Sequence, residues 1–275
     1  MRAVEYENVA TLWRDTEAFL SRDAANNTQA LSAIARLLAR GAHHDERYFA
    51  VRDDADETVV GAAVRVDSKT LFCSAMPEAA ALQLGEFLNE HNVRLDGVVG
   101  ECVVLDAFAK SFDHAHHVHG NMMLYQLMSG PNFGRAMGEL RAVTMADVDL
   151  MVAWQRAFEI EVNMIRVPTP IEERVAASIK DGAPVFWIDD GVPVAMAGAR
   201  KLPASSARIG PVYTPPALRG RGYAQAIVAA AGTHVARDEP RTIFLFTAAE
   251  NPASNKAYQR IGYVHIADHA HWIFD

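Results

Sequence analysis

The run Arg-Gly-Arg-Gly-Tyr-Ala at residues 219–224 constrains the fold of this chain more than any other stretch. It follows an apolar segment at 207–214 that is typical of a strand, and it precedes an alanine-rich segment with helical spacing. A strand that turns through two glycines into a helix directs unpaired backbone N–H groups at one point, where a phosphate group can bind. The sequence therefore predicts a site for a phosphate-bearing cofactor at this junction.

The length of 275 residues exceeds the usual size of one domain, so two domains are expected, each large enough for its own core. Hydrophobic residues make up 50% of the chain and charged residues 22%, which is typical of a soluble globular protein. The 26 basic and 34 acidic residues give a net charge of −8, which repels a phosphate backbone. The net charge therefore argues against nucleic-acid binding as the main activity, and any anion site must be local.

No apolar run approaches the length of a membrane span, and residues 1–8 lack the apolar core of a signal peptide. These two features predict a cytoplasmic protein without a membrane partner. Cys73 and Cys102 stand in apolar settings, and neither their number nor their spacing suits a disulfide framework or a zinc site. We expect both thiols to be buried.

The second half of the chain has clear signals for the ends of helices and strands. Thr144 and Asp147 have the capping-box pattern that starts a helix, Asp190-Gly191 suits a hairpin turn, and Asn251 precedes a proline at a helix start. The predicted strands are 138–143, 184–189, 192–201, 207–214, 241–247, 263–266 and 271–274, and the predicted helices are 144–163, 171–180, the segment from 224 to 235 and 251–261.

The first half repeats the later part of this order. Its predicted strands are 48–52, 58–66, 69–74, 97–101 and 121–128, and its predicted helices are 77–91 and 103–112. Where the second half has its glycine loop, the first has Met-Pro-Glu-Ala-Ala-Ala at 76–81, without a glycine or a basic side chain. We therefore expect a first lobe at 1–130 that cannot hold a phosphate there, a linker at 131–137 and a second domain at 138–275.

Residues 138–275 resemble a GCN5-related N-acetyltransferase (GNAT) domain. The run at 219–224 fits the family's Arg/Gln-x-x-Gly-x-Gly/Ala signature, and the segment from Asn251 to Tyr263 resembles its Asn…Tyr…Gly-Phe/Tyr ending. Ala224 replaces the commoner glycine and Tyr263 replaces phenylalanine, and the family tolerates both. The first half resembles the degenerate partner lobe of tandem GNAT proteins. The resemblance implies an α/β (α+β) fold of two GNAT-like lobes, each a mixed, mostly antiparallel twisted sheet flanked by helices.

The resemblance also implies acetyl-CoA as the co-substrate and no metal. Backbone N–H groups from Gly220 to Ala224 would bind the diphosphate, and the neighbouring arginines would add positive charge. The pantetheine arm has amides that can pair with the strand edge at 212–214, where the family's strand splays away from the next one. The predicted cofactor-binding residues are Val212, Tyr213, Thr214, Arg219, Gly220, Arg221, Gly222, Tyr223, Ala224 and Asn251.

Direct acyl transfer requires that a neutral amine attack the thioester and that a thiolate leave. Tyr258 matches the family's residue that hydrogen-bonds or protonates the thiolate, although a tyrosine packed on the rim would have the same spacing. Trp154, Phe158 and Glu161 fall on one helical face, where the family builds its acceptor pocket. Glu161 is our candidate for binding or deprotonating the amine, but a solvated helix end would also suit it, and a helix distortion would place Glu159 there instead.

The segment Asp-His-Ala-His-His-Val-His-Gly at 113–120 contains imidazoles, which are good metal ligands. No second cluster with fixed ligand spacing accompanies it, and the chemistry inferred above needs no metal. We interpret the segment as a polar loop that enters the strand at 121–128.

Two classes of function fit these observations. The first is an N-acetyltransferase that moves an acetyl group from acetyl-CoA to a primary amine in a ternary complex, and the alternative is a non-catalytic acyl-CoA-binding or regulatory module. Tyr258 separates them, because a pure binder would not require it. The acceptor is a small-molecule or protein amine, and no motif chooses among amino acids, polyamines, aminoglycosides and protein N-termini. We expect the first lobe to shape or cover the acceptor side and the protein to be a monomer or homodimer.

Overall fold

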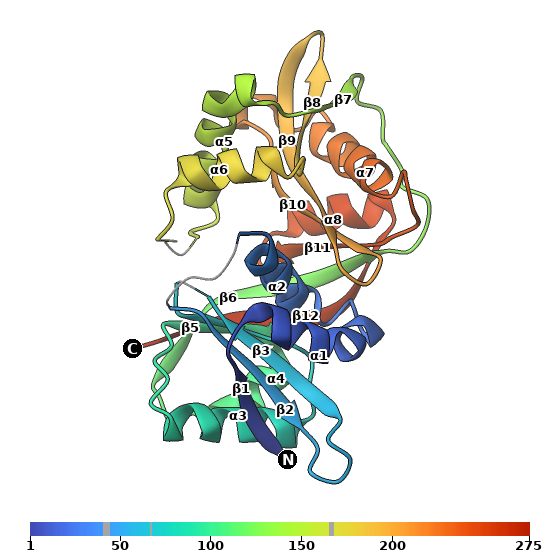
Figure 1. Ribbon diagram of the computed structural model, residues 1–275. Helices are drawn as coiled ribbons and strands as arrows, with labels where there is room; N and C mark the ends of the chain where they lie inside the picture. Colours follow the sequence, from blue (N-terminus) through green and yellow to red (C-terminus); the bar gives the residue numbers. More distant parts are fainter. Residues whose placement is uncertain (41–44, 67, 165–167) are drawn as a thin grey trace. The chain divides into compact units, whose positions relative to one another are not determined.

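Two runs of elements in the same order make up the chain, as Figure 1 shows for the computed structural model. The structure describes residues 1–40, 45–66, 68–164 and 168–275. The first run is β1 (Arg2–Tyr6), α1 (Val9–Arg22), α2 (Thr28–Arg40), β2 (Arg47–Arg52), β3 (Val59–Arg65), β4 (Thr70–Cys73), α3 (Glu78–Glu90), β5 (Gly97–Glu101), α4 (Cys102–Ala109) and β6 (His116–Leu127). The second run is β7 (Glu139–Ala142), α5 (Val148–Glu161), α6 (Ile171–Lys180), β8 (Pro184–Asp189), β9 (Val192–Leu202), β10 (Ser206–Tyr213), α7 (Tyr223–Val235), β11 (Thr242–Ala248), α8 (Pro252–Ile261) and β12 (Tyr263–Phe274).

The local signals of the second half locate its elements well. The capping box of Thr144 and Asp147 is present, and α5 begins after it. Asp190 and Gly191 have φ angles of 49° and 75°, which suit the two central positions of the hairpin turn between β8 and β9. One prediction is wrong: the two closing strands are a single strand, β12. Its later residues pair with β5, a partner far away in the sequence, and this pairing extends the strand.

The first half contains elements that the sequence patterns did not predict. β1, α1 and α2 precede β2, so the first run repeats the whole order of the second rather than only its later part. β6 begins at His116, which corrects the interpretation of 113–120 as a loop that leads into a strand at residue 121. β6 is hydrogen-bonded beside β12 in the sheet, and the His116 ring stacks on Trp272 of β12, with ring centroids 4.6 Å apart and planes 9° apart.

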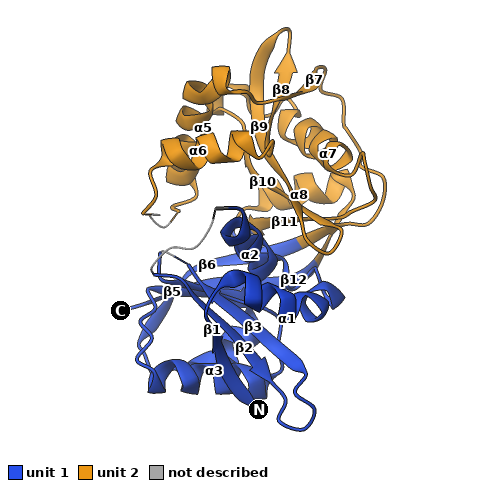
Figure 2. Ribbon diagram, viewed as in Figure 1, with its two compact units in different colours: residues 1–124, 248–250, 266–275 blue, residues 125–247, 251–265 orange. Residues whose placement is uncertain are grey.

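The chain divides into two compact units, which Figure 2 shows in different colours. Unit 1 contains residues 1–124, 248–250 and 266–275, and unit 2 contains residues 125–247 and 251–265. The last strand of the second run completes the sheet of unit 1, because the His269–Ile273 part of β12 pairs antiparallel with β5. The predicted domains 1–130 and 138–275 divide the chain by sequence repeat, and these bounds stay a prediction.

The sheet of unit 1 has the strand order β1-β2-β3-β4-β5-β12-β6, with β6 included up to residue 124, and a hydrophobic core on each face. Successive residues of β2 point to opposite faces, as in any strand. Tyr48 and Ala50 belong to the core that α1 and α2 cover, whereas Phe49 and Val51 belong to the core that α3 and α4 cover. Burial on both faces explains why β2 reads as a continuous apolar run.

The sheet of unit 2 has the strand order β7-β8-β9-β10-β11. Its pairs are antiparallel except β10 with β11, so the prediction of a mixed, mostly antiparallel sheet flanked by helices is confirmed. α5 and α6 cover a core that includes Phe186, Met196 and Tyr213, and α7 contacts β8, β9 and β10. No helix in the described ranges is both long enough and apolar enough to cross a bilayer. The end of β10, the start of α7 and the last turn of α5 thus belong to one unit.

Candidate functional site

β10 and β11 separate partway along β10. Their parallel register ends at the pair Ile209 and Leu245, and no later pair is present in the described residues. On the other side of β10, the pairing with β9 shifts register after Ile209 and resumes at Val212. The edge of Val212 and Tyr213 that faces β11 is therefore open, which is the splay that the resemblance implied. The Oγ1 atom of the next residue, Thr214, is buried without a hydrogen-bond partner in the described structure.

The loop between β10 and α7 turns on two glycines. Gly220 and Gly222 have φ angles of 78° and 86°, in the left-handed region that residues with a side chain rarely adopt. Gly222 is the N-cap residue of α7, and no side chain caps this helix. Among the described residues, the backbone N–H groups from Gly220 to Ala224 have no hydrogen-bond acceptor. Unpaired donors at the positive end of a helix form an anion site.

Tyr223, the first residue of α7, is hydrogen-bonded to β8 through its side chain. Its hydroxyl donates a hydrogen bond to Oδ2 of Asp189, the last residue of β8. This hydrogen bond and burial raise the pKa of Tyr223, while a hydrogen bond from Arg221 opposes the rise. The sequence placed Tyr223 in the site only through its position in the loop and missed Asp189, because no local motif joins two residues that are 34 positions apart.

Arg219 connects the glycine loop to the last residue of α5. Its Nε donates a hydrogen bond to the Thr214 carbonyl oxygen at 2.9 Å, and its Nη2 donates one to Oε2 of Glu161 at 2.6 Å. The guanidinium carbon lies 5.9 Å from the centroid of the Tyr213 ring. Glu161, the candidate acceptor-binding carboxylate, therefore lies beside the glycine loop, and it is ion-paired there.

The aromatic residues of the predicted acceptor face pack against the end of β10. Trp154 and Phe158 are partly buried against the core of unit 2. The Trp154 ring lies 5.3 Å from the Phe186 ring and 6.2 Å from the Tyr213 ring, measured between centroids. This face of α5 thus borders the strand end whose edge is open.

Glu159 belongs to a different contact from Glu161. Its two carboxylate oxygens accept hydrogen bonds from Arg174 of α6 at 2.8 and 3.0 Å. Burial raises the pKa of Glu159, but hydrogen bonds from Arg174 and Gln155 outweigh burial and hold it below its usual value. Glu159 therefore joins two helices, and Glu161 is the carboxylate that faces the loop.

α8 contains the residues of the second predicted motif, and it packs on α7. Asn251 is its N-cap and accepts a hydrogen bond from the Ser254 N–H at 3.1 Å, which confirms the predicted cap. Burial raises the pKa of Tyr258 to about 12, and a side-chain hydrogen bond with Ser254 opposes the rise. The Tyr258 ring lies 6.5 Å from Tyr125 and 6.3 Å from Tyr263, in an aromatic cluster of unit 2. At neutral pH Tyr258 therefore keeps its proton.

In the first run, the segment between β4 and α3 is the equivalent of the glycine loop, and its residues contact other parts of unit 1. The Ala75 N–H donates a hydrogen bond at 2.9 Å to Oδ1 of Asn27, which is fully buried. Met76 packs against the core of unit 1, and the N-cap of α3 is Pro77, which has no N–H group. Glu78 puts a negative charge in the first turn of α3. These contacts leave little at this position to bind an anion.

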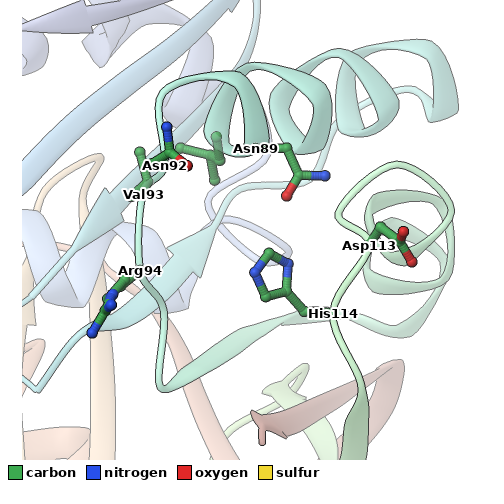
Figure 3. Close-up of a pocket in the computed structure, with 7 residues that line it drawn as sticks. Asn89, Asn92, Val93, Arg94, Asp113 and His114 are labelled. Atoms are coloured by element: carbon green, nitrogen blue, oxygen red, sulfur yellow. The ribbon is translucent and has the colours of Figure 1, made fainter.

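A cavity of about 470 Å³ lies in unit 1, lined by Leu88, Asn89, Asn92, Val93, Arg94, Asp113 and His114. Figure 3 shows it between the end of α3 and the segment after α4. The His114 ring stacks on Phe112 with centroids 4.2 Å apart. None of the residues that the sequence assigned to a site lines this cavity.

The cysteines and histidines show no metal site in the described part of the chain. Cys73 is buried and burial raises the pKa of its thiol to about 12, whereas Cys102 is only half-buried, which corrects that expectation. No group of three or more His, Cys, Asp or Glu side chains is placed to hold a metal ion in the ranges that the structure describes. The predicted absence of a metal stays a prediction.

Comparisons with known proteins agree with this geometry. Residues 148–263 match the model of the acetyltransferase (GNAT) family. An acetyltransferase of the GNAT family from Colwellia psychrerythraea is 16% identical, with a TM-score of 0.60 and coverage of 100% of both chains. A GCN5-related N-acetyltransferase from Sphaerobacter thermophilus is 15% identical, with a TM-score of 0.61 and coverage of 98% of this chain and 95% of that chain.

A tandem GNAT protein from the clavulanic acid biosynthesis pathway is 15% identical, with a TM-score of 0.58 and coverage of 98% of this chain and 97% of that chain. A search of curated protein sequences gave no match. The chain therefore has the fold of tandem GNAT proteins over its whole length. Within it, residues 148–263 form a domain of the GNAT family.

Proposed function

We propose that this chain is an N-acetyltransferase that transfers an acetyl group from acetyl-CoA to a primary amine by direct attack in a ternary complex. The row of unpaired N–H groups from Gly220 to Ala224, beside the open edge of β10, carries the proposal. A ligand that joins a diphosphate to an amide-bearing arm needs these two surfaces next to each other. The family match over 148–263 supports acyl transfer as the reaction.

The residues present suit each part of coenzyme A. The N–H groups of the glycine loop would hold the diphosphate, with positive charge from Arg219 and Arg221. The open edge of Val212 and Tyr213 would pair with the pantetheine amides, and the unpartnered Oγ1 of Thr214 offers one more polar contact. Tyr223 and Ala224 contribute through their backbone, and Asn251 would reach the arm from the start of α8. Acetyl-CoA itself supplies the activated acyl group.

Tyr258 is the proposed acid, and Glu161 is the proposed group for the acceptor amine. A phenol whose pKa is about 12 is protonated at neutral pH, so it can donate its proton to a departing thiolate. A carboxylate can hold the ammonium form of the acceptor and take up a proton as the amine attacks. Glu161 stands next to the glycine loop, where its carboxylate accepts a hydrogen bond from Arg219.

Release of free thiol from acetyl-CoA across a panel of primary amines tests the proposal. Wild-type protein should release thiol with at least one amine, and Tyr258→Phe should lower the rate by about 10²-fold while it leaves acetyl-CoA affinity unchanged. Binding of acetyl-CoA without thiol release for any amine would favour the alternative, a non-catalytic acyl-CoA-binding or regulatory module.

We also propose that each chain binds one acetyl-CoA. The equivalent position of unit 1 supports this, because the Ala75 N–H is already bonded to Asn27, Pro77 has no N–H group, and Glu78 adds a negative charge. Calorimetric titration should give one bound molecule per chain, and a stoichiometry of two would contradict this part of the proposal.

We propose a small-molecule amine or a protein amine as the acceptor. A cytoplasmic location, a monomer or homodimer, no metal, and no nucleic-acid or membrane partner also belong to this proposal.

A further inference from the structure

Arg219 is held by two acceptors of different kinds. Its Nε–H group bonds to the backbone oxygen of Thr214 and its Nη2 bonds to the carboxylate of Glu161. The side chains of Arg219 and Glu161 are 45% and 49% exposed, so water and mobile ions reach the ion pair. A half-exposed ion pair of this kind is weak and is easily exchanged for a stronger one.

A guanidinium group has five N–H donors in a fixed planar arrangement. The two bonds to Thr214 and Glu161 leave donors of Arg219 without an acceptor in the described structure. Gly220, the next residue, begins the row of unpaired backbone N–H groups. A diphosphate bound by this row would carry more negative charge than one carboxylate, and it would compete with Glu161 for the same guanidinium.

We propose that Glu161 masks Arg219 while the cofactor site is empty, and that diphosphate binding draws Arg219 away and frees the Glu161 carboxylate for the acceptor amine. This inference rests on the proposed function. The ion pair thereby couples the two substrates: the negative charge that attracts a cationic amine becomes available only after acetyl-CoA is bound. Glu161 then opposes cofactor binding in the free enzyme, which a residue that served only as a base would not do.

Calorimetric titration of the full-length chain with acetyl-CoA tests this proposal without knowledge of the acceptor. Glu161→Gln should bind acetyl-CoA about two- to fivefold more tightly than wild type, and the gain should shrink as salt is added, because the pair is exposed. Arg219→Gln should bind more weakly by about three- to tenfold. In the double variant the Glu161 change should have no further effect, since the two residues act through one contact.

Glu172→Gln is the matched control. Glu172 forms an ion pair of similar exposure with Arg156 at 2.8 Å, between α5 and α6 of the same unit, and neither residue belongs to the proposed site. Loss of the Glu172–Arg156 ion pair in this variant should leave acetyl-CoA affinity unchanged. Equal melting temperatures for Glu161→Gln and wild type would show that the fold is retained.

The outcomes separate the two proposals. If wild type binds acetyl-CoA and Gly222→Glu weakens binding, but Glu161→Gln binds equally or more weakly than wild type, the masking role is wrong and the proposed function stands. If wild type does not bind acetyl-CoA at all, the proposed function fails and the masking role fails with it.

Discussion

The hydroxyl of Tyr223 donates a hydrogen bond to the carboxylate of Asp189, and this bond ties the first residue of α7 to the last residue of β8. Unpaired N–H groups bind an anion well only if they already point to one place before the ligand arrives. Gly220 and Gly222 make the loop flexible in principle, so a rigid anchor immediately after them matters. The Tyr223 contact supplies that anchor.

Tyr223→Phe removes this hydrogen bond and keeps the ring. We expect acetyl-CoA affinity to fall about fivefold, because the loop then pays an ordering cost on binding. Titration calorimetry measures the effect. Tyr6→Phe is the control, since Tyr6 also donates to an aspartate, Asp15 at 3.1 Å, but in unit 1. Equal losses in both variants, or no loss in Tyr223→Phe, would contradict the anchoring role.

Gly222 allows a second, sharper change. An alanine Cβ there would lie 3.6 Å from Cβ of Ala136, an ordinary contact, so Gly222→Ala suffers only from the backbone strain of a φ angle of 86°. That strain costs about 1 to 2 kcal/mol of stability. Gly222→Glu adds a negative charge next to the expected diphosphate and should weaken acetyl-CoA binding at least ~10-fold.

Gly130→Ala serves as the control for the glycine variants, because its Cβ would meet no atom within 4 Å. Its stability in urea and its affinity for acetyl-CoA should match those of wild type. Unchanged affinity in Gly222→Glu would mean that the diphosphate does not bind at this loop.

Elements that depend on neighbours in the sequence could be predicted from it. The capping box of Thr144 and Asp147 joins residues three positions apart, and the Asn251 cap likewise reaches Ser254. Their geometry follows from helix pitch and short side chains alone. The cap of α1 is of the same kind, since Asn8 accepts from the Thr11 N–H at 2.9 Å, and it is a local signal that the predicted set of elements lacks.

Contacts between distant residues could not be predicted in this way. The pairing of β12 with β5 joins His269–Ile273 to residues 97–101, and no spacing rule brings such segments together. In the candidate site, the glycine loop was identified from its motif, but the partner of each charged side chain was not. Helical spacing predicted the face of α5 on which Glu161 lies. Only the fold shows that the Glu161 carboxylate accepts a hydrogen bond from Arg219.

Asn251 has two proposed roles that one pair of variants can separate. Asn251→Ala removes the cap of α8 and should lower the free energy of unfolding by about 1 kcal/mol. Asn251→Ser keeps a capping oxygen but shortens the side chain, so stability in urea should return toward that of wild type. If the Asn251 amide also touches the pantetheine arm, the serine variant should still bind acetyl-CoA about threefold more weakly. Wild-type affinity in Asn251→Ser would limit Asn251 to capping.

His271 gives unit 1 a defined pH dependence. Burial, together with the neighbouring His119 ring, lowers the pKa of His271 from 6.5 to about 4. Between these two pH values His271 binds a proton in the unfolded chain but not in the folded chain. The free energy of unfolding therefore has its full value above pH 6.5 and falls as the pH drops toward 4. A shift of this size corresponds to a loss on the order of 3 kcal/mol.

Urea unfolding at a series of pH values measures this loss, and the difference between variants isolates it from other titrating groups. His271→Gln cannot be protonated, so its unfolding free energy should fall less steeply than that of wild type between pH 6.5 and pH 4. His91→Gln, which removes an exposed imidazole from the same unit, serves as the control substitution. Parallel slopes for His271→Gln and wild type would show that His271 is protonated as readily in the folded chain as in the unfolded one.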